Sequence, residues 1–465
     1  MMRLQHKIII VLMTILVLVV GFLSYNGLNG LGFHYLLESR ETGTVYLWYT
    51  NEYMTDYYNN VASIYNKDNA YADVVPKLVD ASEYLEQIYQ ASIQGEEFPD
   101  IFIITNDVLE KAYLSGLTLP VENASKVKGM FPQVAIDAAS YDGMLLGYPF
   151  YFDTSTLVYN KSMLEQVAFD QFVLTAEAEG VENPEAIEVP QEDIDHLVNL
   201  MIPETIDELI DLANNIEAPE GLETVFKWNI NDVFFNYFYL GEYTTLSSDN
   251  IDIYNENTAA CMKIFKRVTE YFYMDAETVT TENVLDEFMQ GKVLFTILDS
   301  DSAVKLENAK AEGKIGFEYD YALIPDPGRV IEKDEEGNNV IVSGETILQG
   351  RPLSTTSMVV INGYADQPHT AADFAEFLTM ESYYTSQLYE RTGYIPAYKN
   401  AGVTGNMEKV FKLEYENSVP MPNQMVTSNF WMLLENAFNE IWEGADAKET
   451  LEALEGRLKN QIPNE

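Results

Sequence analysis

Short apolar runs alternate with amphipathic stretches along the first part of the chain. Residues 44–50 read TVYLWYT, a run of β-branched and aromatic residues that predicts a buried strand. Residues 53–65 then place apolar side chains at the spacing of an amphipathic helix. The same order recurs, with a strand expected over 72–79, a helix over 83–94 and a strand over 99–104. This alternation predicts an α/β domain with a largely parallel sheet covered by helices on both faces.

A second set of elements follows an aromatic run that ends in a carboxylate. Residues 147–160 read GYPFYFDTSTLVYN, in which Asp153 separates the aromatic run from a second strand-like stretch. We expect the chain to leave one domain and enter another here. Residues 203–216 begin with Pro and early acidic residues, as a helix start prefers, and residues 288–301 predict a helix end, a Gly-Lys turn and a strand.

Two stretches of this second region have the composition of surface insertions. Residues 164–201 are acidic and only partly periodic, and residues 330–347 contain the polar run EKDEEGNN. Helical patterns return over 371–380 and over 430–458. The second region is therefore expected to carry additions at its surface and to end in helices.

An apolar segment stands near the start of the chain. Arg3 and Lys7 precede the uncharged run 8–23, as in a secretory signal or a signal anchor. No small-x-small cleavage site is obvious after the run, which favours a retained anchor, but length alone leaves both outcomes open. The single cysteine, Cys261, lies far from this run. It therefore offers no lipid attachment there, no intrachain disulfide and no cysteine-based metal cluster.

Length and charge narrow the classes of function. A chain of 465 residues suits two domains, and a hydrophobic fraction of 47% is enough for their cores. The formal net charge of -47 repels phosphate groups and anionic lipids. We therefore expect no nucleic-acid partner, and membrane contact only through the N-terminal segment.

Several loose motifs follow one another in a specific order from residue 44 to the end of the chain. They are PDIFIITND with YLSGL downstream, GYPFYFDTSTLVYN, PETIDEL, FMQGKVLFTI, AADFAEFLT, TGYIPAY and PMPNQMVTSNFW. This series resembles the extracellular solute-binding proteins of bacterial ABC importers, in the cluster that includes maltose-binding and other oligosaccharide-binding proteins.

The resemblance implies a periplasmic-binding-protein-like α/β fold, with a ligand cleft between two lobes and an added N-terminal hydrophobic helix. Three crossovers would join the lobes near 153–154, 354–356 and 395–396. The implied parts are a signal peptide or anchor with its spacer (1–41), lobe 1 (42–153 and 356–396) and lobe 2 (154–355 and 397–465).

The resemblance also places the ligand contacts in loops after strands of both lobes and in the first crossover. The matching positions are Asn51, Glu52, Asn106, Asp107, Asp153, Trp228, Asn229, Asn231, Asp299, Asp301 and Trp431. Two of them have an open alternative, since Asp107 could cap a helix and Trp228 could belong to a core. At the end of the strand in 288–301, where sugar-binding relatives often place an aromatic residue, this chain has LDSD.

The residue types at these positions favour a carbohydrate. Sugar hydroxyls hydrogen-bond to Asp, Glu and Asn side chains, and the C–H faces of a pyranose ring pack on aromatic rings such as that of Trp431. An amino acid or peptide would call for an Arg clamp on its carboxylate, and no Arg stands at a matched position. Asp299 and Asp301 have the spacing of part of a calcium loop but lack the Gly and Glu that complete it. We expect no metal and no cofactor.

Catalysis is not expected. The chain lacks G-x-S-x-G, H-E-x-x-H, a Walker loop and a Rossmann glycine fingerprint, and its four histidines are scattered. A glycoside hydrolase would need two acids about 5 to 9 Å apart, which no sequence spacing establishes.

The predicted protein is a monomer at the outer face of a bacterial cell membrane. It would capture a mono- or oligosaccharide and deliver it to the permease subunits of an ABC importer, either tethered by an uncleaved N-terminal helix or released after signal cleavage. The alternatives are a membrane-anchored sugar sensor that feeds a signalling partner and, least favoured, a glycoside hydrolase.

Overall fold

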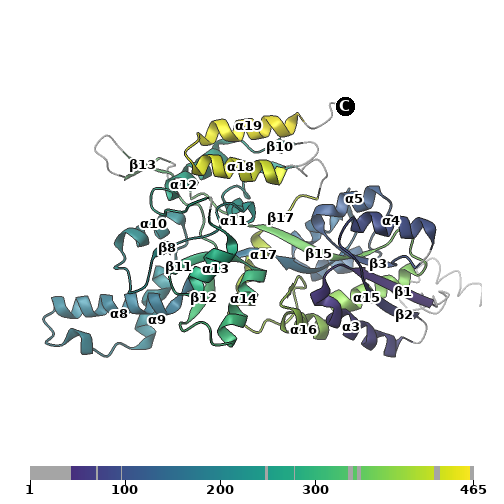
Figure 1. Cartoon of the computed structure of the whole chain (residues 1–465), viewed down its shortest axis with the longest axis horizontal. Helices are drawn as coiled ribbons and strands as arrows, with labels where there is room; N and C mark the ends of the chain where they lie inside the picture. The colour runs from purple at the N-terminus through teal and green to yellow at the C-terminus, as the bar shows by residue number, and fades with distance from the viewer. Residues whose placement is uncertain are drawn as a thin grey trace, which may run out of the picture.

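The computed structural model describes residues 43–69, 72–95, 97–246, 250–276, 278–333, 339–342, 347–423 and 430–460. They form two lobes side by side along the long axis of the molecule (Figure 1). The apolar run 8–23, predicted to form an N-terminal hydrophobic helix, lies outside the described residues. Within those residues, no helix combines the length and apolarity that crossing a membrane requires.

Lobe 1 is built on a mixed β-sheet. Over the described residues it has seven strands in the order β16-β6-β15-β3-β1-β2, with β17 also paired to β15. The strands are β1 (Gly43–Tyr49), β2 (Ala72–Leu78), β3 (Ile101–Thr105), β6 (Tyr148–Asp153), β15 (Leu353–Ile361), β16 (Ile395–Pro396) and β17 (Val419–Pro420). The β1 strand runs parallel to β2 and β3, whereas β15 is antiparallel to β3 and β6. The prediction of a largely parallel sheet is therefore correct only for the pairs among β1, β2 and β3, because β15, which enters lobe 1 from the second crossover, runs in the opposite direction between β3 and β6.

Helices flank this sheet where the sequence pattern places them. The predicted helix over 53–65 begins as a short 3₁₀ turn capped by the Asn51 side chain and continues as α3, whose inward face carries Tyr57, Tyr58 and Val61. The elements of lobe 1 besides the sheet are η2 (Glu52–Met54), α3 (Thr55–Asp68), α4 (Tyr84–Gln94), η3 (Asn106–Val108), α5 (Leu109–Leu114), α6 (Ala124–Met130), α7 (Gln133–Ala138), the hairpin of β4 (Ser140–Tyr141) and β5 (Met144–Leu145), α15 (Pro368–Met380) and α16 (Ser382–Thr392).

Lobe 2 has a smaller sheet of order β12-β7-β11-β8. Its strands are β7 (Ser155–Asn160), β8 (Thr224–Phe226), β11 (Val293–Asp299) and β12 (Tyr319–Ala322). Both neighbours of β7 run antiparallel to it, and β11 runs parallel to β8. The helix expected from Pro203 begins only at Ile206, because Thr205 and Glu208 form a reciprocal capping box that fixes its first turn.

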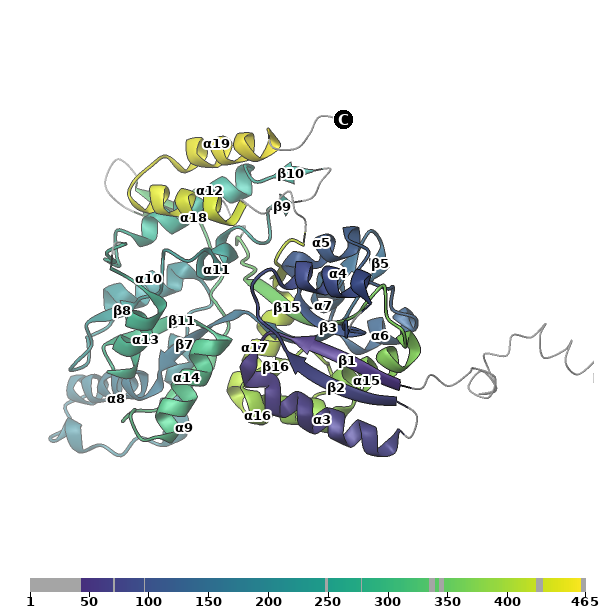
Figure 2. The same ribbon diagram turned by 45° about the vertical axis from the view of Figure 1, so that its right-hand side comes forward.

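Helices and hairpins surround this second sheet. They are α8 (Lys161–Ala178), η4 (Pro184–Ala186), α9 (Gln191–Met201), α10 (Ile206–Asn215), α11 (Val233–Asn236), η5 (Tyr237–Tyr239), β9 (Thr245–Leu246), β10 (Ile251–Asp252), α12 (Glu256–Val268), α13 (Thr281–Met289), α14 (Ser300–Ala311), β13 (Ile331–Lys333), β14 (Asn339–Ile341), α18 (Phe430–Trp442) and α19 (Ala447–Lys459). The α8–α9 pair, which spans the predicted insertion 164–201, projects from the end of the lobe (Figure 1). The α18 and α19 helices pack over α12 (Figure 2).

Three crossovers connect the two lobes in the part of the chain that the structure describes. Asp153 ends β6 in the larger sheet, and Ser155 begins β7 in the smaller one. Thr154 lies between them and donates a hydrogen bond of 2.9 Å to the carbonyl oxygen of Leu353, which starts β15 on the second crossover. The third crossover leaves β16 and leads into α17 (Asn406–Asn417). The residue limits of the lobes given above stay predictions.

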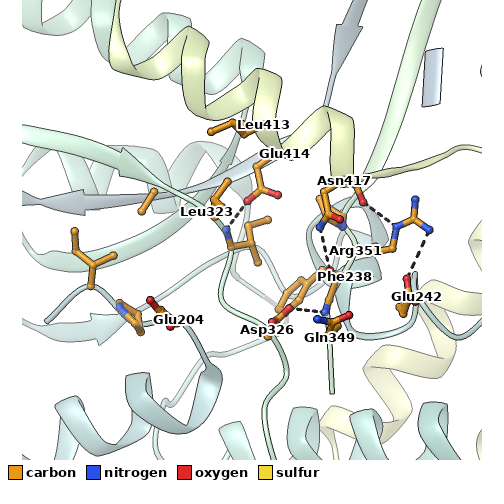
Figure 3. Close-up of a pocket in the computed structure, with 16 residues that line it drawn as sticks. Glu204, Phe238, Glu242, Leu323, Asp326, Gln349, Arg351, Leu413, Glu414 and Asn417 are labelled. Carbon is orange, nitrogen blue, oxygen red and sulfur yellow. Dashed lines mark hydrogen bonds and ion pairs between the residues drawn. The ribbon is translucent and has the colours of Figure 1, made fainter. Parts of the chain in front are cut away.

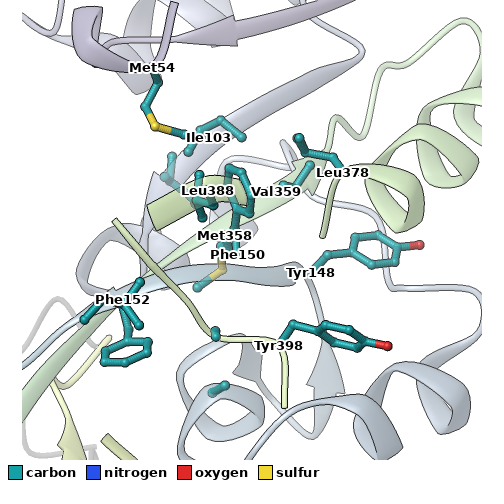
Figure 4. Close-up of a cluster of buried hydrophobic side chains, with 14 of the residues drawn as sticks. Met54, Ile103, Tyr148, Phe150, Phe152, Met358, Val359, Leu378, Leu388 and Tyr398 are labelled. Atoms are coloured by element: carbon teal, nitrogen blue, oxygen red, sulfur yellow. The ribbon is translucent and has the colours of Figure 1, made fainter. Parts of the chain in front are cut away.

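The α17 helix ties the lobes together. Its Tyr415 ring stacks on Phe152 of lobe 1 with centroids 3.9 Å apart, and its Phe411 ring meets Tyr321 of lobe 2 at 6.2 Å. One apolar core therefore runs from lobe 1 through α17 into lobe 2, beside a second core inside lobe 2. Figure 4 shows Phe150, Phe152 and Met358 within the first core. The GYPFYF run begins with Gly147 because a Cβ there would lie 2.8 Å from the sulfur of Met358.

Candidate functional site

Asp153 occupies the first crossover, at the junction of the two sheets. Its Oδ1 accepts hydrogen bonds from the Ser300 backbone N–H at 3.0 Å and from the Ser300 hydroxyl at 2.6 Å. The antiparallel register of β7 and β11 pairs Ser155 with Asp299 and so brings β11 to this place. Burial, followed by the charge of Asp299, raises the pKa of Asp153 to about 8. The Asp153 carboxyl group is therefore largely protonated at neutral pH.

Three further acidic side chains of lobe 2 act electrostatically on Asp153 or on its neighbour Asp299. Asp299 caps α14 by accepting a hydrogen bond from the Ser302 backbone N–H at 2.7 Å. Asp301 stands in the first turn of α14 and is exposed. Partial desolvation by neighbouring atoms raises its pKa, as does the charge of Asp299, whereas the charge of Lys305 lowers it. Asp232 caps α11. Burial raises its pKa, as does the charge of Asp299, whereas the hydrogen bond from the Phe234 backbone N–H lowers it. Asp232 directly follows the predicted contact Asn231 but was not itself among the predicted contacts.

Two tyrosines of lobe 1 lie close enough to these carboxyl groups to interact with them electrostatically. The Tyr151 and Tyr394 rings are stacked with centroids 4.6 Å apart and an interplanar angle of 28°. The Nδ2 atom of Asn51 donates a hydrogen bond of 2.8 Å to the Tyr394 hydroxyl. Burial raises the pKa of Tyr394, and the charges of Asp301 and Asp153 raise it further, whereas the hydrogen bond from Asn51 lowers it. Side chains of the two lobes thus share one electrostatic environment.

We call this group the crossover cluster. It comprises Asn51, Tyr151, Asp153, Asp232, Asp299, Asp301 and Tyr394, taken from both lobes. Of the predicted contacts, the structure brings Asn51, Asp153, Asp299 and Asp301 together here. Tyr394 was missed because its motif, TGYIPAY, was used only to place a crossover. Glu52 follows Asn51 and is exposed.

Trp228 does not line a surface between the lobes. Its side chain is 0% exposed, its Nε1 donates a hydrogen bond of 2.8 Å to Oδ1 of Asn236, and its ring stacks on Phe226 at 4.5 Å. The indole is thus held inside the second core with its only polar group satisfied. The placement of Trp228 at the ligand cleft is wrong, and the core alternative is correct.

Asn106 is also a structural residue. It is 0% exposed, its Oδ1 accepts a hydrogen bond of 2.8 Å from the Thr356 backbone N–H, and its Nδ2 donates one to the Met421 carbonyl oxygen. Because both ends of the amide bind backbone groups, Asn106 fastens β3 to the second crossover. Its predicted role as a ligand contact is wrong.

Four predicted contacts belong neither to the crossover cluster nor to the buried pair of Trp228 and Asn106. Asn229 donates a hydrogen bond of 3.0 Å to the Thr281 hydroxyl, and Asn231 donates one of 2.6 Å to the Ala276 carbonyl oxygen, so their amide groups shape the loop after β8. Asp107 is exposed and accepts a hydrogen bond from the Thr105 hydroxyl. Trp431 is half-buried in the first turn of α18, with its ring 5.7 Å from that of Tyr237. The roles of these four residues stay predictions.

The crossover cluster combines an aromatic pair with several carboxyl groups, and the charge of Lys305 acts on one of them, that of Asp301. Such a set can hydrogen-bond hydroxyl groups and pack against an apolar ring face. Among the residues that the structure describes, no group of three or more His, Cys, Asp and Glu side chains is arranged to hold a metal ion. The arrangement suits a neutral, hydroxyl-rich molecule.

Comparison with known proteins decides the family. A family model described as bacterial extracellular solute-binding protein matches residues 60–410. The chain belongs to this family. The resemblance drawn from the sequence motifs is thereby confirmed, and the extracellular description of the family agrees with the expected export of this solute-binding protein.

Solved structures show the fold of the solute-binding protein. An extracellular solute-binding protein from Staphylococcus aureus in complex with maltose has a TM-score of 0.69 and 17% identity, with 90% of this chain and 97% of that chain covered. A cyclo/maltodextrin-binding protein with maltotetraose has a TM-score of 0.68 and 18% identity, with 92% of this chain and 99% of that chain covered. A maltose-binding periplasmic protein from Listeria monocytogenes has a TM-score of 0.67 and 18% identity, with 90% of this chain and 98% of that chain covered. The predicted two-lobed periplasmic-binding-protein-like fold is confirmed. A comparison with curated proteins finds no match.

Proposed function

We propose that this solute-binding protein captures a carbohydrate between its two lobes and delivers it to the permease of an ABC importer. The observation that carries the proposal is the crossover cluster, in which the stacked Tyr151 and Tyr394 rings of lobe 1 lie close enough to the carboxyl groups of Asp153 and Asp301 to interact with them electrostatically. The maltose and maltotetraose complexes of its structural neighbours support a sugar as the ligand.

The two sides of the cluster supply different parts of sugar recognition. The carboxylates accept hydrogen bonds from sugar hydroxyls, and a protonated Asp153 can donate one in return. The Tyr394 ring offers an apolar face to the C–H groups of a pyranose ring. A carboxylate-bearing ligand would be repelled by the same side chains, which favours a neutral sugar over an amino acid or peptide.

Capture of the sugar depends on closure of the two lobes about the crossovers that connect them. Because contacts to one sugar come from both lobes, the ligand binds more tightly when the lobes are closed and shifts the population toward that state. A permease that recognises the closed state would then receive loaded protein in preference to empty protein.

Calorimetric titration of the full-length chain with maltose, maltotriose and maltotetraose tests the ligand class, with amino acids and polyamines as controls. Replacing Asp301 by Asn removes a charged acceptor, and replacing Tyr394 by Ala removes an aromatic face, so each change should weaken sugar binding by about 1 to 3 kcal/mol. Tyr273, which is 90% exposed, gives a matched control as Tyr273→Ala. Wild-type affinity in both cluster variants would overturn the site, and binding only among the control compounds would overturn the sugar.

Delivery is tested in cells by the uptake of radiolabelled sugar. Deletion of the gene should abolish uptake if the protein serves an importer. Unchanged uptake together with a lost transcriptional response to sugar would instead identify a sensor. Cell fractionation and the mass of the mature N-terminus distinguish a tethered protein from one released after cleavage within or beyond 8–23.

A further inference from the structure

A cavity of about 520 Å³ lies where α17 meets the segment after β12 and the second crossover (Figure 3). None of the residues that line it belongs to the crossover cluster. Its volume falls within the range typical of small-molecule sites, roughly 300 to 1,000 Å³. The cavity is therefore large enough for a ligand of its own.

A buried carboxylate opens into this cavity. Glu414 of α17 is 3% exposed, and one of its oxygens accepts a hydrogen bond of 2.5 Å from the Ile324 backbone N–H. Its other oxygen accepts no hydrogen bond from the residues that the structure describes, and the carboxyl group forms part of the cavity wall (Figure 3). The ionised form of a carboxyl group that is almost wholly buried and bonded through only one oxygen is costly, and a cationic ligand would lower this cost.

Three further acids line the same space, and one of them, Glu242, lies beside Arg351. Asp326 accepts a hydrogen bond of 2.7 Å from the Gly350 backbone N–H, and Glu204 stands beside it on the cavity wall. Burial is the main cause that raises the pKa of Glu414, and the Asp326 charge adds to it. Burial likewise raises the pKa of Asp326, to which the Glu204 charge contributes. In their ionised forms the carboxyl groups of Glu414, Asp326 and Glu204 would repel one another across the cavity, and the proton held by Glu414 limits this repulsion.

The one arginine of the cavity lining does not relieve this repulsion. The Nε atom of Arg351 donates a hydrogen bond of 2.8 Å to the Asn417 carbonyl oxygen, and its Nη2 donates one of 2.7 Å to that of Ser418. Its Nη1 lies 3.6 Å from Glu242. The guanidinium is thus committed to two backbone carbonyls and a different carboxylate.

Apolar side chains line the cavity together with the acids. Phe238, Pro203 and Pro352 contribute to the walls, so methylene groups would be well accommodated between the charges. An inorganic cation fits this lining poorly, since in the described part of the chain no group of three or more His, Cys, Asp and Glu side chains is placed to hold a metal ion. We propose that the cavity binds a linear aliphatic diamine or polyamine, with its ammonium groups on Glu414, Asp326 and Glu204 and its methylene chain against the apolar walls. The site is independent of the proposed sugar function.

Calorimetric titration of the full-length chain with spermidine and cadaverine tests the site. We expect one saturable site per chain, weakened about tenfold or more in Glu414→Gln, because the amide keeps the acceptor for Ile324 but loses the charge. Glu416→Gln is the matched control, since Glu416 lies on the same helix, is exposed and is absent from the cavity lining. This control accounts for weak attraction of amines to the acidic surface, and 1,5-pentanediol tests whether the charge is needed.

A second readout follows from protonation. Because Glu414 has its pKa raised to about 8, it holds a proton at pH 7 that a bound ammonium group would displace. Titrations in buffers of different ionisation enthalpy should show proton release in the wild-type chain and its loss in Glu414→Gln. Asp326→Asn, which keeps the acceptor for Gly350, should also weaken binding. Equal affinity in the wild type and Glu414→Gln, equal binding of pentanediol, or only multiple weak sites would each overturn the proposal.

Discussion

Replacement of Asp153 by Asn should make the protein more stable at neutral pH. The amide keeps an oxygen in the place of Oδ1, which accepts both hydrogen bonds from Ser300, and the change removes only the ionisable group. In the wild type the pKa of Asp153 is raised from 3.8 to about 8. Between these values the native state holds a proton that the unfolded state has released. The free energy of unfolding therefore falls as pH rises, and the stabilisation present at low pH is lost by about pH 8.

The magnitude follows from the size of this shift. Each pH unit inside the window costs the wild type about 1.4 kcal/mol of stability, whereas the amide of the variant does not titrate and would contribute no such slope. The advantage of Asp153→Asn should therefore grow by roughly 3 kcal/mol between pH 5 and pH 7. Glu414, whose pKa is also raised to about 8, titrates in both proteins and cancels in the comparison.

Urea denaturation followed by circular dichroism at pH 5, 6 and 7 measures this difference. Asp73→Asn, which changes an exposed aspartate of β2, is the control and should show little change relative to wild type. A stability difference between Asp153→Asn and the wild type that does not change with pH would refute the assignment of a half-buried, largely protonated Asp153.

Two further predictions concern the folded framework. Trp228→Phe removes the indole N–H that binds Asn236, and the loss of this buried hydrogen bond should cost about 1 to 3 kcal/mol in urea denaturation while sugar affinity stays at the wild-type value. Weaker sugar binding with unchanged stability would restore Trp228 to the ligand site. Gly241→Ala would place a Cβ 2.1 Å from the carbonyl oxygen of Arg351 and should destabilise the chain by at least about 2 kcal/mol in thermal melts. Gly129→Ala, which meets no atom within 4 Å, should change stability by less than about 1 kcal/mol, and equal effects of the two changes would contradict the close approach at Gly241.

Most of the individual strands and helices could be predicted from local sequence. The apolar pattern of 44–50 and the amphipathic pattern of 53–65 became β1 and α3 with shifts of a few residues. The start of α10 depends on Thr205 and Glu208, which are three residues apart. These signals work because strand periodicity, helix periodicity and capping involve residues that are close in sequence.

The candidate site depended on contacts between distant parts of the chain. The Asn51 amide meets the Tyr394 hydroxyl across 343 positions, and Asp153 meets Ser300 across 147. The motif resemblance found one side of the first contact but not the other. Sequence spacing carries no information about such pairs, because the strand order of the folded sheets decides which side chains meet.

By itself the sequence determined the α/β class, the position of the first crossover and, through its motif order, the family. Only the tertiary structure decided the direction of the connecting strands, the protonation of Asp153 and the burial of Trp228. The physical reason is the same in each case. A strand direction, a pKa and a buried surface are set by neighbours in space, and for Trp228 one of these neighbours is Trp442, which meets it edge to face at 5.9 Å from more than two hundred positions along the chain.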